Sequence, residues 1–162
     1  MEKKEIQFIS EQLRDAYEGG PWYGKSFIEL TGEIPESIVF VKKEGQHSIL
    51  ELLWHMITWR EFTVDRLQHS PQMQMTYFEK NDWRELDHND TTLWRQGLER
   101  FKETQDQLLS LLADRDDSLL DQGVRERSYN FRKLLHGIIQ HDIYHLGQMI
   151  VVWKEEAVHL GE

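Results

Sequence analysis

Four stretches of the chain place apolar residues three or four positions apart, the spacing that buries one face of an α-helix. The chain has only three prolines, and all of them lie outside these stretches. Because proline ends or kinks a helix, this distribution favours uninterrupted helices. The predicted helices run from about Lys4 to Glu18, from Ser48 to about His69, from Asp90 or Thr91 to an acidic turn that begins at Asp114, and from about Asn130 to Glu156.

Two longer segments between the predicted helices lack this periodicity. Residues 22–46 contain three glycines and a proline, although Phe27 to Leu30 could form one or two helical turns. The run from Ile38 to Val41 has the composition of a β-strand, but no second strong run exists to pair with it, so a loop at one end of the helices is favoured. Residues 71–89 are polar and irregular, and Trp83 is expected to anchor them on the helices.

These elements predict an all-α fold. The expected architecture is a four-helix bundle of the up-and-down type, with a long connection between the first two helices and room for one crossover. A length of 162 residues suits one domain that spans residues 1–162. Ser48 and Glu51 form a capping box that starts the second helix, whose apolar residues spread over more than half of its circumference. That helix should therefore be largely buried.

Charge and composition exclude several classes of function. Against 19 basic side chains stand 29 acidic ones, and the formal charge of −10 disfavours binding to nucleic acid or to anionic membranes. The chain has no cysteine, so disulfides are excluded and any metal must be held by nitrogen or oxygen. The charged start of the sequence does not resemble a signal peptide, and no apolar run has membrane-spanning length. We expect a cytoplasmic protein.

The last predicted helix carries a pair of histidines, His141 and His145, with a spacing of i and i+4. Such residues differ by about 40° around a helix, so both imidazoles can reach one ion. The pair also lies within the apolar stripe of that helix, where neutral imidazoles need partners for both ring nitrogens. Taken alone, the pair is explained equally well by a metal site and by two hydrogen-bonded core histidines.

His55 favours the metal site. It lies on the same face of the second helix as Leu52, Trp59 and Phe62, so it too should point inward. Three inward histidines from two helices can supply three nitrogen ligands and leave at least one coordination position for water or substrate. An open position of this kind is typical of a catalytic metal.

Other polar residues have weaker claims on the site. Asp142 is not expected to act as the glutamate of a zinc protease does, because it points about 100° away from His141; it should be solvated or support the ligands. Glu51 could support His55, but the capping box explains it better. Tyr144 is a core candidate, and together with Gln148 it could orient a water or substrate. The remaining histidines are not expected to bind metal. His47 should pack as a helix staple, and His136 faces another side of its helix. His69, His88 and His159 should be solvated.

The chain resembles the DinB/YfiT-like superfamily of bacterial metal-binding four-helix bundles, and in particular its DinB branch. The resemblance spans nearly the whole chain, and the fourth-helix segment is the most specific. The matching segments are Gly20–Gly24, His47–Ile49, Glu51–His55, Trp59–Glu61, Asn81–Trp83 and Leu135–Gln148. The metal ligands of the family fall at His55, His141 and His145. The resemblance further implies nickel or zinc and a homodimer.

The resemblance implies several activities, because the superfamily contains thiol S-transferases that use bacillithiol or similar thiols, mycothiol-dependent isomerases and putative metal-dependent hydrolases. An open three-histidine metal could activate either a thiol or a water. We therefore predict a metal-dependent transferase that joins a low-molecular-weight thiol to a small electrophile. A hydrolase of a small molecule and a non-catalytic, metal-binding stress-response protein are the alternatives.

Overall fold

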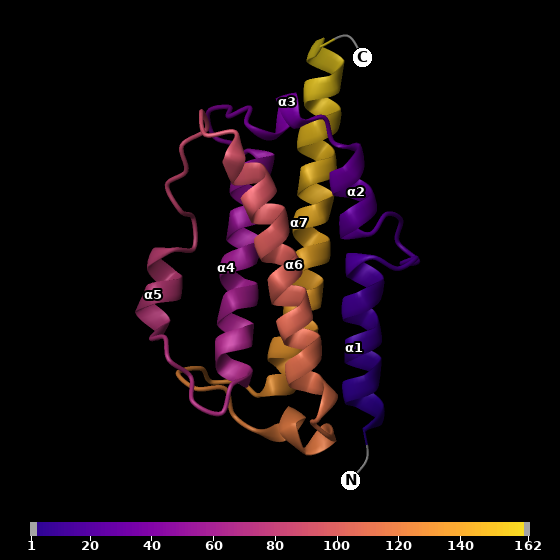
Figure 1. The fold of residues 1–162 in the computed structure, drawn as a ribbon, viewed down its shortest axis with the longest axis vertical. Coiled ribbons are helices and arrows are strands. Elements are labelled where there is room, and N and C mark those ends of the chain that lie inside the picture. The colour runs from indigo at the N-terminus through magenta and orange to yellow at the C-terminus, as the bar shows by residue number, and fades with distance from the viewer. Residues whose placement is uncertain (1–2, 161–162) are drawn as a thin grey trace.

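A computed structural model describes residues 3–160 and is helical throughout its regular structure (Figure 1). Within that range the only strand-like pairing is an isolated bridge between Gly123 and Asn130. Four long helices lie side by side: α1 (Lys4–Tyr17), α4 (Ile49–Leu67), α6 (Thr92–Ala113) and α7 (Phe131–Leu160). Short elements fill the connections: α2 (Phe27–Glu33), α3 (Glu36–Val39), α5 (Met75–Lys80) and the 3₁₀-helix η1 (Asp117–Asp121). The all-α prediction is confirmed.

The directions of the long helices do not simply alternate along the chain. Side-chain hydrogen bonds pair α4 and α6 in the same order along both helices: Trp54 with Leu93, Arg60 with Thr104, and, just beyond the end of α6, Leu67 with Arg115. These two helices are therefore parallel, and residues 68–91 return along the molecule to join them (Figure 1). The expected long connection between the first two helices is present, and this second long connection is the crossover.

Local sequence signals explain where the helices start. Ser48 accepts a hydrogen bond from the backbone N–H of Glu51, and the Glu51 carboxylate accepts from the backbone N–H of Ser48, so the predicted capping box is formed. Ser26 and Glu29 form the same arrangement at the start of α2. This second box extends the one or two turns predicted for residues 27–30 into a helix of seven residues.

The two irregular segments contain more helix than the sequence indicated. Residues 38 and 39 belong to the single turn α3, and both side chains are fully buried, so the strand-like composition reflects burial alone. In the segment 71–89, predicted to be irregular, Met75 and Phe78 lie three positions apart in α5 and bury one side of a short helix. Two buried positions in one short helix are too few to show helical periodicity in a sequence.

Arg60 crosses the core between three long helices. Its side chain is only 2% exposed, its guanidinium lies 4.2 Å from the centre of the Phe101 ring, and it donates to Asp142, Thr104 and Gln105. Asp142 is therefore buried and ion-paired, which excludes the solvated position, one of the two alternatives that the sequence left open. The reverse holds for Tyr144, a predicted core residue whose side chain is 63% exposed.

Helix α4 is largely buried, as its sequence predicted, and α6 and α7 cover two of its sides. The apolar residues form two clusters along the bundle, and the site histidines lie near the level at which these clusters meet. Within residues 3–160 no helix combines the length and the apolar character that crossing a membrane requires.

Candidate metal centre

The structure brings the three predicted histidines together. His55 extends from α4, while His141 and His145 extend from successive turns of α7. The Nε2 atom of His141 lies 3.0 Å from Nε2 of His55 and 3.1 Å from Nε2 of His145. One potential ligand atom from each of the three residues lies within 4.8 Å of the others. His55 and His145 are buried, and His141 is half-buried.

The hydrogen bonds of the Nδ1 atoms determine whether the inward-facing Nε2 atoms carry a proton or a free lone pair. Nδ1 of His55 donates to the backbone carbonyl of Asp82 at 3.0 Å, and Nδ1 of His145 donates to Oε1 of Gln148 at 2.5 Å. A neutral imidazole carries one N–H, so Nε2 of both rings is unprotonated. A proton on Nε2 of His141 could serve only one of these two lone pairs. A cation among the three nitrogens satisfies all of them.

The spacing of the nitrogens also fits a metal ion. Imidazole nitrogens bind zinc at about 2.0–2.1 Å, so two ligands of a tetrahedral ion stand roughly 3.3 Å apart. The two distances of 3.0 and 3.1 Å to His141 differ little from this spacing. The donors are three neutral nitrogens with no protein carboxylate or thiolate among them, which suits zinc, nickel, copper or iron.

A segment of the long connection, residues 81–84, packs on α4 beside His55. The Trp83 ring lies between the imidazoles of His47 and His55, with ring centres 3.6 and 3.9 Å away and nearly parallel planes. Asp82 accepts from Nδ1 of His55 through its backbone carbonyl, and its Oδ1 accepts from Nε1 of Trp59 at 2.6 Å. Trp83 therefore anchors this segment on the helices, as predicted from the sequence. Sequence reasoning gave no role to Asp82, which orients His55.

The other site candidates have distinct positions. Gln148 accepts from His145 and so supports a ligand, whereas Tyr144 is exposed and only accepts a 3.4 Å hydrogen bond from Gln148. Glu51 caps α4 and forms an ion pair with Lys42, so it does not support His55. The capping explanation is the correct one.

The remaining histidines stand apart from the three ligands. His47 stacks on Trp83, His136 lies 3.5 Å from Glu5 on another face of α7, and His69 is exposed. His88 was expected to be solvated, but it is half-buried and its Nε2 lies 3.0 Å from Oγ of Ser48. The side chain of His159 lies outside the described part of the structure.

Burial keeps two of the three imidazoles neutral. Desolvation, reinforced by the neighbouring His141, lowers the pKa of His145 to about 4. Desolvation also lowers the pKa of His55, although the hydrogen bond to Asp82 opposes part of that effect. Near neutral pH both rings are unprotonated, which is the form that binds a metal.

This protonation behaviour predicts that metal-free protein loses stability in mild acid. Because the folded pKa of His145 lies below its unfolded value, the unfolded chain takes up its proton first as the pH falls below about 6.5. The free energy of unfolding should be highest above this pH and should fall by about 1 kcal/mol per pH unit towards pH 4. Urea unfolding in EDTA at several pH values measures this slope. An unchanged slope in His145→Leu would contradict the assignment.

Gln148 offers a test of ligand orientation. Replacing it with leucine removes the acceptor for Nδ1–H of His145, so we expect a loss of about 10- to 100-fold in metal affinity. Competition with a chromophoric zinc chelator measures this affinity. Tyr144→Phe removes only the hydroxyl at the end of the same chain of contacts and should bind zinc as the wild type does. Equal affinities in all three proteins would exclude the role of Gln148.

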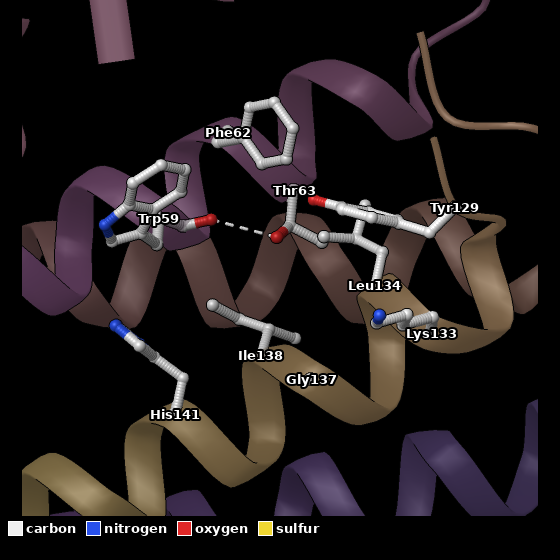
Figure 2. A pocket seen from close by; sticks show the side chains of 9 residues that line it. All are labelled: Trp59, Phe62, Thr63, Tyr129, Lys133, Leu134, Gly137, Ile138 and His141. Atoms are coloured by element: carbon white, nitrogen blue, oxygen red, sulfur yellow. Dashed lines mark hydrogen bonds between the residues drawn. The ribbon is translucent and has the colours of Figure 1, made fainter. Parts of the chain in front are cut away.

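An apolar pocket of about 230 Å³ adjoins His141 (Figure 2). It lies between α4 and the first half of α7, and His141 contributes one end of its lining. The walls come mainly from the side chains of Trp59, Phe62, Leu134 and Ile138. A small molecule in this pocket would contact His141, one of the three histidines.

The fold and this site define a class: helical proteins whose long helices together present three histidines able to hold one metal beside a small-molecule pocket. Comparison with protein families identifies the family. Residues 24–149 match the family model of the DinB superfamily, and the chain belongs to this superfamily. No curated protein and no solved structure gives a significant match. The choice of nickel or zinc and the homodimer stay predictions.

Proposed function

We propose that the protein is a metal-dependent transferase that joins a low-molecular-weight thiol of the bacillithiol type to a small electrophile in the cytoplasm. The observation that carries this proposal is the convergence of three Nε2 atoms from a four-helix bundle, with a pocket beside them. His55, His141 and His145 would hold one divalent ion, zinc or nickel, and leave at least one position open.

The chain's own residues supply binding and orientation. Asp82 and Gln148 orient the rings of His55 and His145, and the apolar pocket offers a small molecule a binding surface beside His141. The chain has no cysteine, so the reacting sulfur must come from a cosubstrate. A divalent ion held by the histidines would lower the pKa of that thiol.

The reaction is a substitution. The thiol releases its proton to solvent, its sulfur forms a bond to the electrophilic carbon, and the bond from that carbon to the leaving group breaks with its electron pair going to the leaving group. No oxidant or reductant is needed.

The test uses protein purified without a histidine tag and loaded with zinc or nickel. Bacillithiol and monochlorobimane are mixed with it, and the thioether product is measured by fluorescence and mass spectrometry. We expect metal-dependent turnover in the wild type and in His136→Ala, and none in His145→Ala.

Two other outcomes would replace the proposal. Hydrolysis of small esters or amides without any thiol would identify a hydrolase, since the same three nitrogens can activate water. Stoichiometric metal binding with neither reaction would indicate a binding protein without turnover.

A further inference from the structure

The pocket beside His141 has two chemically different ends. In Figure 2, His141 and Trp59 lie at one end, and Tyr129 and Lys133 lie at the other. Lys133 and His141 are eight residues apart on α7, which corresponds to about 12 Å along the helix. Between them the lining is apolar, so a ligand that spans the pocket needs an apolar middle.

Lys133 is placed to receive a negative charge. Its Nζ lies 5.7 Å from the centre of the Tyr129 ring, and no carboxylate of residues 3–160 forms an ion pair with it. Nearby Arg132, by contrast, pairs with both Glu5 and Asp121, so those two carboxylates are already engaged by another cation. The Tyr129 hydroxyl likewise has no hydrogen-bond partner in the described structure, so it can donate to the same anion.

We propose that this pocket binds a small aromatic or aliphatic carboxylate, whose carboxylate contacts Lys133 and Tyr129 and whose apolar body lies along α7 towards the three histidines. The volume of about 230 Å³ suits a small molecule and falls below the range usual for drug-sized ligands. That the far end of this molecule is the electrophilic one rests on the proposed function.

Gly137 gives a direct way to fill the pocket. It lines the pocket from the first third of α7, and a Cβ added to it would meet no atom within 4 Å. Gly137→Leu should therefore occupy the space without disturbing the fold, and glycine is itself unfavourable within a helix. Gly147 lies on the same helix, also has open space at its Cβ, and lines a different pocket. Gly147→Leu is the matched control.

The experiment measures binding of 4-phenylbutyrate and of its neutral amide to the zinc-loaded full chain by ligand-observed NMR, with no thiol present. We expect the wild type to bind the carboxylate about tenfold more tightly than the amide. Lys133→Glu should remove that preference, whereas Lys154→Glu, an exposed position near the other end of α7, should keep it. Gly137→Leu should weaken both ligands at least about tenfold, whereas Gly147→Leu should leave them unchanged.

The outcomes separate this inference from the proposed function. Equal affinity for carboxylate and amide, or wild-type binding by Gly137→Leu and Lys133→Glu variants that melt as the wild type does, overturns the inference even if thiol conjugation is observed. Binding that depends on Lys133 and Gly137, in a protein without thiol conjugation, supports the carboxylate site and overturns the transferase reaction alone.

Discussion

Replacing any one of His55, His141 and His145 with alanine should weaken zinc binding by more than about 100-fold, because even residues that only support a ligand contribute 10- to 100-fold. The wild type should bind one zinc per chain. His136→Ala is the matched control, since it removes a half-buried histidine from the same helix α7 outside the site. Metal analysis after dialysis, together with chelator competition, gives both the stoichiometry and the affinity.

The weaker zinc binding of these variants should also appear as a smaller effect of zinc on thermal stability. Zinc at 100 times the dissociation constant of the wild type adds about 2.7 kcal/mol to the free energy of unfolding. For a chain of this size, that corresponds to a rise of roughly 5–10 °C in Tm. A variant that binds 100-fold more weakly should gain only about 0.4 kcal/mol at the same concentration. If zinc leaves the Tm of the wild type unchanged, the three histidines are core residues bonded to one another, and the metal site is wrong.

The position of the histidines was predictable because it depends on helical geometry alone. His141 and His145 share a face by their spacing, and His55 shares a face with apolar neighbours, so burial of those faces brings all three to the core. Asp82 could not be assigned in this way. Its contact with His55 spans 27 positions of sequence and depends on how an irregular connection folds back onto α4.

The directions of the helices were harder to predict for a related reason. A long connection can join two antiparallel helices or return the chain to make them parallel, and its length alone does not distinguish the two. In this protein, contacts of residues 81–84 with α4 hold the connection along the bundle, through Thr58 to Asn81 and Arg84 to Glu61. These polar contacts leave no periodic signal in the sequence.

Asp142 shows why a residue beside a ligand can be misjudged. A helical-wheel calculation places it about 100° from His141, which left solvent or support of the ligands as its expected surroundings. That direction instead points to the space where Arg60 reaches in from α4, and Arg60 had no predicted role. Two opposite charges on different helices become a buried pair only through tertiary packing.

Replacing Asp142 with alanine should therefore cost about 3–5 kcal/mol of stability, because it leaves the Arg60 guanidinium buried without a counter-charge. In a chain of this size, that loss lowers Tm by about 10 °C. Asp106→Ala is the control: it breaks an exposed ion pair with Lys102 and should change stability far less, because solvent screens exposed pairs. Urea unfolding of both variants in EDTA measures the costs without any contribution from metal.

The double variant Arg60→Met with Asp142→Leu separates charge burial from packing. Apolar side chains of similar size remove the uncompensated charge, and replacing a buried ion pair in this way is often neutral or stabilising. The double variant should recover most of the stability lost in Asp142→Ala, although Thr104 and Gln105 lose their partner in Arg60. If Asp142→Ala costs no more than Asp106→Ala, the pair does not hold α4 and α7 together. The alignment of His55 with His141 and His145 would then depend on the apolar contacts between the two helices.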